Sequence, residues 1–365
     1  MNRASRYMAL ALSLGRRGHG RVWPNPAVGC VIVKENRIVG RGWTQPSGRP
    51  HAEAMALAQA MSKARGADAF VTLEPCAHHG KTPPCADALI EAGVARVFVA
   101  ARDPDPRVDG AGIARLRDAG IEVETGILED EALRDNAGFF ARVEIDRPFV
   151  TLKLANSFDG RIATATGESK WITGDAARRH VHALRARHDA VIVGGGTARK
   201  DDPSLTVRGL GIEYQPSRVV VSRRLDLPLM GQLARTARDT PVLLCHGHDA
   251  DGHLMQTWQD LGAVLLPCGA ANGQLDPADV LRQLARHGLT RLFCEGGSAL
   301  AASLLEADLV DELVGFSAGF AIGAEGLPSV GALGLGRLND AHRFVLRTVD
   351  AVGGDVMQVW ARALD

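Results

Sequence analysis

Three metal-binding side chains and one carboxylate lie within a short stretch of the N-terminal third of the chain. His51, Cys76 and Cys85 supply an imidazole and two thiols, and Glu53 follows His51 by two residues. Three protein ligands that leave one coordination position open are typical of a catalytic zinc site, whereas structural zinc sites are usually closed by four. A carboxylate beside a zinc-bound water can take its proton and deliver it to a leaving amine. The pattern therefore predicts a hydrolytic zinc site in which Glu53 transfers the proton.

The same residues allow a structural alternative. His78 and His79 lie close to Cys76 in the sequence, and either imidazole could act as a fourth ligand and close the site. A non-catalytic scaffold stabilised by zinc is then an open alternative to an enzyme. The remaining cysteines lie in apolar stretches and are expected to be buried as small hydrophobic residues: Cys30, Cys245, Cys268 and Cys294.

A second set of residues indicates a site for phosphate esters in the C-terminal two thirds of the chain. Residues 291–303 read as a strand followed by Glu-Gly-Gly and by Ser298, which begins a helix whose free N–H groups suit a pyrophosphate. The stretch AVIVGGGT at 190–197 reads as a strand that ends in a close backbone approach to a ligand or in a tight turn. Arginines, whose planar guanidinium suits phosphate, flank nearby polar turns: Arg161, Arg185, Arg199 and Arg208.

The elements that must position these residues alternate between strand and helix along the chain. In the first part, strands are expected at 27–33, 37–42, 69–73, 94–100 and 121–125, and helices at 6–14, 51–64, 85–92, 112–119 and 129–141. In the second part, strands are expected at 148–155, 190–193, 218–221, 242–245 and 292–294, and helices at 178–187, 277–287 and 298–307. This alternation predicts α/β layers with both sheet faces covered. The pattern restarts at Pro148, which predicts two domains, 1–146 and 147–365.

Length and composition agree with this division and exclude several classes of protein. A chain of 365 residues is expected to form two domains at roughly 100 to 200 residues each. Lys plus Arg and Asp plus Glu number 42 each, so the net charge is zero and broad electrostatic binding of nucleic acid is not expected. No apolar run approaches the ~20 residues that cross a bilayer, and no signal peptide is apparent, so we expect a cytoplasmic protein that binds no membrane.

The order of the metal-binding residues resembles that of the zinc deaminases, in which H-x-E precedes P-C and a second cysteine. Here TLEPCAHHGKTPPC at 72–85 separates the cysteines by eight residues instead of two. Together with PNPAVG at 24–29 and PHAE at 50–53, this stretch closely resembles the deaminase half of the bifunctional riboflavin-biosynthesis deaminase/reductase family. The resemblance implies a cytidine-deaminase-like α/β/α domain, with zinc on His51, Cys76 and Cys85 and Glu53 as proton shuttle.

The resemblance also implies the substrate of this half. The family deaminates 2,5-diamino-6-(5-phosphoribosylamino)pyrimidin-4-one, and the matching positions imply that Asn25, His78 and Lys81 bind it. The chain departs from the family pattern at Gly42-Trp43-Thr44, where a histidine is expected in place of Thr44. We expect Thr44 to replace only part of the contact that this histidine would make with the phosphate or ribose.

Three further stretches resemble the family's reductase half, which has a dihydrofolate-reductase-like α/β fold and uses NADPH. They are LKLANSFDGRIATATGESKWITG at 152–174, LRARHDAVIVGGGTARKDDPSLTVR at 184–208, and EGG at 295–297. The resemblance implies NADPH contacts from Ala155, Trp171, Thr197, Asp201, Ser222, Gly297, Ser298, Ala299, Leu300, Ala301, Ala302 and Ser303. It implies substrate contacts from Ser169, Arg185, Leu205, Arg208 and Glu295, with Arg185 and Arg208 on the phosphate.

The reaction implied for this half is reduction of the ribosyl group of 5-amino-6-(5-phosphoribosylamino)uracil to ribityl. We expect Lys153 to assist protonation as hydride arrives, and Arg223 or Arg224 to contact the NADPH 2′-phosphate. The resemblance covers about residues 5–355 and favours a homo-oligomer acting on a small phosphoribosyl pyrimidine. A nucleic-acid-editing deaminase with an accessory domain is a second hypothesis, against which the zero charge and 5% aromatic content argue.

Overall fold

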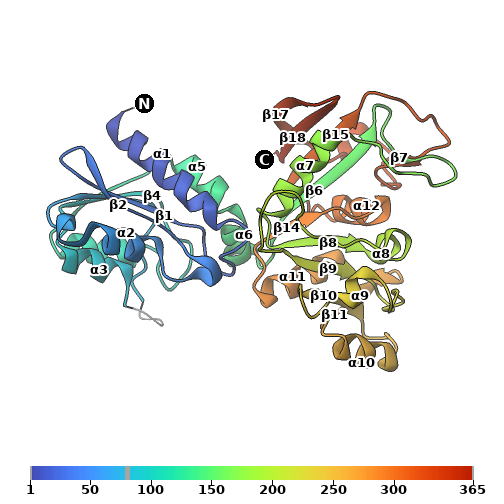
Figure 1. Ribbon diagram of the computed structural model, residues 1–365, viewed down its shortest axis with the longest axis horizontal. Coiled ribbons are helices and arrows are strands. Elements are labelled where there is room, and N and C mark those ends of the chain that lie inside the picture. The colour runs from blue at the N-terminus through green and yellow to red at the C-terminus, as the bar shows by residue number, and fades with distance from the viewer. Residues whose placement is uncertain (1, 79–82, 364–365) are drawn as a thin grey trace. The chain divides into compact units, whose positions relative to one another are not determined.

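The computed structural model describes residues 2–78 and 83–363, and it divides into two compact units, Met1–Asp146 and Arg147–Asp365 (Figure 1). Each unit has a mixed sheet and its own helices. No helix in the described ranges combines the length and apolarity that a membrane span requires.

The first unit contains a five-stranded sheet in the order β2-β1-β3-β4-β5. Its strands are β1 (Gly29–Lys34), β2 (Arg37–Trp43), β3 (Asp68–Leu73), β4 (Arg96–Ala101) and β5 (Glu122–Thr125). Strand β1 pairs antiparallel with β2 and β3, whereas β3, β4 and β5 run parallel. All residues of β3 are buried, as expected for a strand that is covered on both faces.

Six α-helices accompany this sheet in the described part of the unit: α1 (Arg3–Gly15), α2 (Ala52–Ala60), α3 (Cys85–Ala92), α4 (Ala111–Asp118), α5 (Glu129–Asp135) and α6 (Ala137–Ile145). Figure 1 shows α1 and α5 on one side of the sheet and α2 and α3 on the other. Glycine allows α1 to approach β1 closely, because a Cβ at Gly29 would lie 1.8 Å from the carbonyl oxygen of Ala11. Gly42 of β2 does the same for α2, where a Cβ would lie 2.1 Å from the carbonyl oxygen of Ala52.

The helix predicted at 129–141 is wrong as a single element, because it breaks at Asn136 into α5 and α6. Asn136 is 2% exposed and its side chain binds the backbone of a distant loop. Its Oδ1 accepts from the N–H of Ala27 at 2.8 Å, and its Nδ2 donates to the carbonyl of Ala27 at 3.4 Å. These side-chain bonds to the backbone of the loop accompany the break in the helix.

The second unit contains a nine-stranded sheet in the order β11-β10-β9-β8-β14-β6-β15-β18-β17. These strands are β6 (Phe149–Ser157), β8 (Ala190–Gly194), β9 (Ser217–Val221), β10 (Val242–Gly247), β11 (Val264–Cys268), β14 (Arg291–Cys294), β15 (Glu312–Ala318), β17 (Phe344–Val352) and β18 (Asp355–Arg362). The strands from β11 to β15 run parallel, and β18 and β17 extend the sheet antiparallel. The carboxyl ends of β8, β14 and β6 therefore meet at one edge, where ligands bind in open α/β sheets.

The helices of this unit are α7 (Asp175–Arg185), α8 (Gly195–Asp201), α9 (Gln232–Arg235), α10 (Gly252–Asp260), α11 (Pro277–His287) and α12 (Ser298–Glu306). Two short ladders pair β7 (Arg161–Ala163) with β16 (Leu327–Pro328) and β12 (Ala270–Ala271) with β13 (Gln274–Leu275). One core places Trp258 of α10 and Leu233 of α9 with Val191 and Val193 of β8. Another places Val181 of α7 against Phe293 of β14.

The glycines at 194–196 do not form a tight turn. Gly194 ends β8 with extended backbone angles, and α8 begins directly at Gly195. Strands β11, β15, β17 and β18 were not predicted. In β17 seven consecutive residues are exposed, so this strand lacks the buried face that an alternating pattern would mark.

Candidate active sites

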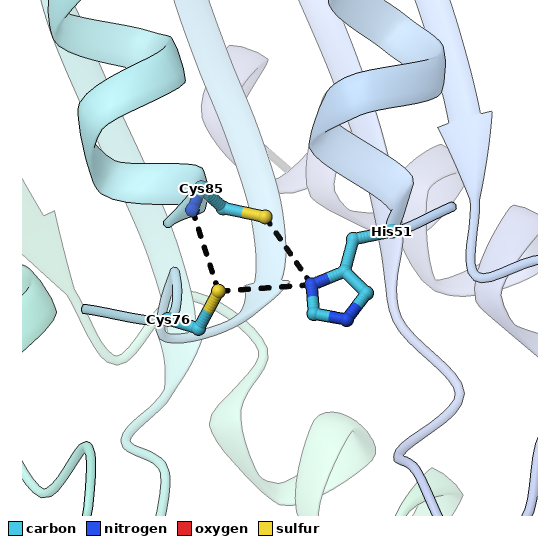
Figure 2. A group of neighbouring side chains, drawn as sticks. All are labelled: His51, Cys76 and Cys85. Atoms are coloured by element: carbon cyan, nitrogen blue, oxygen red, sulfur yellow. Dashed lines mark hydrogen bonds between the residues drawn. The ribbon is translucent and has the colours of Figure 1, made fainter. Parts of the chain in front are cut away.

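The three predicted metal ligands come together at the ends of three elements of the first unit. His51 is the N-cap of α2, Cys85 is the first residue of α3, and Cys76 lies in the segment after β3. Figure 2 shows the Nδ1 atom of His51 turned toward both sulfurs. It lies 3.3 Å from the Sγ of Cys85 and 3.7 Å from the Sγ of Cys76, and all three ligand atoms lie within 4.8 Å of one another.

These separations fit a zinc ion. Zn–N bonds of about 2.0 Å and Zn–S bonds of about 2.3 Å at tetrahedral angles separate nitrogen from sulfur by about 3.5 Å. Within the described ranges the group contains these three residues, and His78 does not belong to it. His79 lies outside the described residues. The donor set is that of a site with a position left for water or substrate.

The electrostatics of the group also favour a cation. The Cys85 thiol donates to the Cys76 sulfur, which lowers the pKa of Cys76 to about 4 and raises the pKa of Cys85. The backbone N–H of Cys85, at the start of α3, also donates to the Cys76 sulfur at 3.3 Å. The hydrogen bond to Cys76 raises the pKa of His51. A site that stabilises a thiolate beside an imidazole provides the ligand atoms that zinc prefers.

Glu53 lies beside this group in the first turn of α2 and is 3% exposed. Burial is the main cause that raises the pKa of its carboxyl to about 7. A carboxyl with a pKa near neutrality can both accept and release a proton under ordinary conditions. Glu53 lines the same cavity as His51 and Cys76, as the proton-transfer role requires.

This cavity has a volume of about 350 Å³ and includes two of the residues expected to bind substrate, Asn25 and His78. The Nδ1 of His78 is buried and has no hydrogen-bond partner in the described part of the chain, so it is available to a ligand. Lys81 lies outside the described residues. Thr44 lines the cavity, but its hydroxyl accepts from the N–H of Val28 at 3.0 Å and donates to the carbonyl of Val28 at 3.4 Å. That hydroxyl is thus committed to the backbone.

The loop after β4 supplies a wall of this cavity that sequence reasoning missed. Asp103, Asp105, Arg107 and Val108 line it. Arg107 binds the carboxylate of Asp105 and holds the pKa of Asp105 below its ordinary value. Burial raises the pKa of Asp103 to about 6. The stretch DPDPR predicts only a turn; two acidic residues directly after a buried strand were the available signal.

The second unit contains a groove along the carboxyl ends of β8 and β14. It consists of cavities of about 480 Å³ and about 550 Å³ that have lining residues in common at Gly194, Gly196 and 298–300. Most of the predicted site residues line it: Lys153, Ala155, Ser169, Thr197, Asp201, Glu295, Gly297, Ser298, Ala299, Leu300, Ala302 and Ser303.

The other predicted residues of this unit do not line the groove. Ala301 and Leu205 are buried, and Ser222 is buried with its hydroxyl donating to Asp226. Trp171 is 71% exposed, and the guanidinium of Arg178 lies over its ring. The N–H of Arg208 donates to the Nδ1 of His182.

Arg185 was expected on the substrate phosphate, but the structure pairs it with a carboxylate. Its Nε and Nη2 donate to Glu295 at 2.5 and 3.0 Å, and its Nη1 donates to the carbonyl of Thr206 at 2.8 Å. The Nζ of Lys153 lies 4.0 Å from Glu295. Burial lowers the pKa of Lys153. Burial opposes ionisation of Glu295, yet Arg185 and Lys153 hold the pKa of Glu295 below its ordinary value.

The start of α12 fits the pyrophosphate of a dinucleotide. Its N-cap is Gly297, no side chain caps the helix, and the N–H of Gly297 donates to the hydroxyl of Thr197 at 3.1 Å. The helix opens into the groove, and glycine at 296 and 297 leaves its backbone accessible. Free N–H groups and the helix dipole at such an end favour phosphate oxygens.

In one unit, a group of three zinc ligands borders a cavity that a buried carboxyl also lines; in the other, a dinucleotide groove contains a largely buried lysine. Together they define a two-site enzyme that joins a hydrolytic deaminase to a reductase. Comparison with known proteins agrees. Residues 1–101 match the cytidine and deoxycytidylate deaminase zinc-binding region, and residues 148–357 match the RibD C-terminal domain. The chain belongs to the RibD family of riboflavin biosynthesis proteins.

Individual relatives match over nearly the whole chain. The riboflavin biosynthesis protein RibD of Escherichia coli (strain K12) is 42% identical over 96% of this chain and 97% of that protein. RibD of Aquifex aeolicus is 40% identical over 98% of both. The solved structure of Acinetobacter baumannii RibD, form 2, superposes with a TM-score of 0.88 at 38% identity, covering 99% of both chains. A deaminase/reductase of Thermotoga maritima superposes with a TM-score of 0.87 at 34% identity, again covering 99% of both.

The fold and function predicted from the resemblance are thereby confirmed. The chain is a bifunctional enzyme of riboflavin biosynthesis, with a cytidine-deaminase-like unit that binds zinc and a dihydrofolate-reductase-like unit that uses NADPH. The four apolar-stretch cysteines are buried and free, as predicted.

Proposed function

We propose that residues 1–146 deaminate 2,5-diamino-6-(5-phosphoribosylamino)pyrimidin-4-one and that residues 147–365 reduce the resulting 5-amino-6-(5-phosphoribosylamino)uracil. The observation that carries the proposal is the three-ligand group, of which His51 and Cys76 line one cavity together with Glu53. The Thermotoga maritima relative is named as a deaminase and reductase of these phosphoribosyl compounds, which supports the same pair of substrates.

In the first unit, His51, Cys76 and Cys85 would hold zinc, which supplies a Lewis acid that lowers the pKa of water. Asn25, His78 and Lys81 orient the pyrimidine and its phosphate. The carboxylate of Glu53 accepts a proton from the attacking water and then donates it to the departing amino group. The oxygen of water becomes the carbonyl oxygen on the ring carbon that carried the amino group, and the amino group leaves as ammonia with the transferred proton. The pKa of about 7 for Glu53 suits both transfers.

In the second unit, the groove residues and the N–H groups at the start of α12 would hold NADPH, which would supply hydride. Reduction of the ribosyl group at its anomeric carbon would break the bond from that carbon to the furanose ring oxygen, and this oxygen would need a proton. We propose that the Nζ of Lys153 supplies it. Burial lowers the pKa of Lys153 and so makes the ammonium a better acid, while Glu295 keeps it in place. In this arrangement Arg185 does not contact the substrate phosphate but orients Glu295, which faces the substrate.

The geometry favours Arg223 over Arg224 as the residue that contacts the 2′-phosphate of NADPH. Arg223 lines the groove and pairs with Asp249 at 3.0 Å, whereas Arg224 is exposed and does not line it. Arg223→Ala should weaken NADPH binding about tenfold relative to NADH, and Arg224→Ala, the matched control, should not. Nucleotide fluorescence titration measures the affinities for NADPH and NADH. If their ratio is the same in wild type and in Arg223→Ala, Arg223 does not contact the 2′-phosphate.

The decisive experiment supplies the diaminopyrimidine phosphate with and without NADPH and follows ammonia and nicotinamide absorbance. Glu53→Gln should abolish ammonia release yet still oxidise NADPH when given the uracil intermediate. Lys153→Ala should show the reverse pattern. Ammonia release by Glu53→Gln at the wild-type rate would contradict the deaminase assignment, and a near-normal reductase rate of Lys153→Ala would contradict the role of Lys153.

We also propose that the enzyme forms a homo-oligomer and works in the cytoplasm on small phosphoribosyl pyrimidines. The exposed apolar residues of the outermost strand β17 support an association through the second unit: Val345, Leu346 and Val349 are 48, 45 and 55% exposed. Analytical ultracentrifugation that finds a monomer at micromolar concentration would contradict the oligomer.

A further inference from the structure

Glu74 is a buried carboxylate that has no part in the proton transfer or metal binding described above. It follows the last residue of β3 and lies two residues before Cys76. Only 3% of it is exposed. A charge at such a position is costly unless hydrogen bonds compensate it, so the partners of Glu74 indicate what it does.

Four backbone N–H groups donate to its two oxygens. Gly112 and Ile113 donate to Oε1 at 2.9 and 3.1 Å. Gly110 and Asp103 donate to Oε2 at 3.0 and 3.4 Å. All four belong to the segment that follows β4, which consists of the loop 102–110 and the first turn of α4.

The bonds to Gly112 and Ile113 satisfy the start of α4. This helix has Gly110 as its N-cap and no side-chain cap of its own. A carboxylate there takes up N–H groups that lack partners within the helix and complements the positive end of the helix dipole. The backbones are also in close contact, because a Cβ at Gly112 would lie 1.9 Å from the carbonyl oxygen of Pro75.

The loop held in this way forms a wall of the deaminase cavity. Asp103, Asp105 and Arg107 line that cavity together with the zinc ligands His51 and Cys76. The loop's own side-chain bonds are local: Asp103 accepts from the N–H of Asp105, and Asp105 accepts from the N–H of Arg107. Such local turns shape the loop but do not fix it against the neighbouring strand.

We propose that Glu74 is a positioning residue that holds the loop 103–108 at a set distance from the zinc ligands, and that substrate binding depends on this. The zinc ligand Cys76 and Glu74, which binds the loop, thus lie two residues apart on one short stretch of chain. The inference rests on the proposed deaminase function of this cavity.

The test compares Glu74→Gln with Glu91→Gln, which removes one exposed acidic group from the same unit. The amide keeps the size of the side chain but presents N–H groups to two of the four donors. We expect the KM for the diaminopyrimidine phosphate to rise about tenfold, which corresponds to about 1.4 kcal/mol, with kcat within about threefold of wild type. Zinc content and reduction of the uracil intermediate should stay at wild-type values, and Glu91→Gln should change none of these.

Hydrogen exchange supplies a readout that does not depend on turnover. In Glu74→Gln the amides of Gly110, Gly112 and Ile113 should exchange faster, while those of β3 and β4 keep their protection. Gly112→Ala, which forces α4 away from Pro75 but retains the carboxylate, should raise the KM in the same way.

An unchanged KM in both variants would overturn the inference. So would loss of zinc from Glu74→Gln, because Glu74 would then act through Cys76. Failure of the wild-type enzyme to release ammonia would instead refute the proposed function itself, so the two failures are distinguishable.

Discussion

Replacing Glu295 by Gln removes a carboxylate that lines the reductase groove and pairs with two largely buried cations, Arg185 and Lys153. The side chains of Arg185 and Glu295 are 12 and 10% exposed, and their two hydrogen bonds measure 2.5 and 3.0 Å. Breaking one side of a buried pair typically costs about 3 to 5 kcal/mol, because the remaining charge keeps its desolvation penalty.

The structure favours the lower end of that range. Lys153, 4.0 Å from Glu295, can lose its proton, and burial already lowers its pKa. Arg185 cannot be deprotonated, but it keeps the carbonyl of Thr206 at 2.8 Å as a partner. One unpaired guanidinium therefore remains, and we expect the second unit to lose about 3 kcal/mol of unfolding free energy.

Urea unfolding at pH 7 measures this loss, with the hydrogen-exchange protection of the buried strands β8 and β14 reporting on the second unit. The matched control is Glu213→Gln, which removes an exposed acidic group from the same unit and should stay within about 0.5 kcal/mol of wild type. Ammonia release should be unaffected in both variants. A loss below about 1 kcal/mol in Glu295→Gln would refute the argument, since the pair would then behave as a solvent-exposed one.

Three further predictions address other parts of the enzyme. Burial lowers the pKa of His188 to about 3, below the ~6.5 of an unfolded histidine. Between these two pH values His188 is protonated in the unfolded chain but neutral in the folded one. The unfolding free energy is therefore unaffected by this group above about pH 6.5 and falls toward pH 3, by at most about 1.4 kcal/mol per pH unit. Calorimetry from pH 7 to 5 should show a smaller loss in His188→Gln, and identical slopes would contradict this. Chelation of zinc should stop ammonia release yet leave NADPH oxidation with the uracil intermediate, and loss of both activities would contradict the separation of the two sites. Gly29→Ala should lower the unfolding free energy of the first unit by about 1 to 3 kcal/mol, because its Cβ would lie 1.8 Å from a backbone oxygen of α1; an unchanged denaturation midpoint would contradict it.

The elements that carry the metal ligands could be predicted because their signals are local. Apolar strands such as β3 and the helix that begins at Cys85 appear in the sequence with nearly their final bounds. The break at Asn136 could not be predicted, since the backbone groups of Ala27 that it satisfies lie 109 residues away. The exposed strand β17 lacks the buried face that would have identified it.

The same distinction applies to the sites. His51, Glu53, Cys76 and Cys85 follow from residue type and spacing. The pairing of Arg185 with Glu295 joins residues 110 apart in the sequence. Without knowledge of this partner, an arginine close to a glycine-rich turn is interpreted as a phosphate ligand. Positioning by Glu74 was equally hidden, because its partners are backbone groups whose direction depends on the fold.

Asn136 has a consequence for the order in which the enzyme matures during translation. The loop that presents Asn25 to the cavity is bound at Ala27 by an amide near the end of the first unit. Chains grow from the amino end and domains usually fold as units as they emerge. A nascent chain that stops short of Asn136 already contains His51, Cys76 and Cys85 but lacks this anchor, so its ribosome-bound form should acquire metal-binding capacity before it acquires affinity for the pyrimidine.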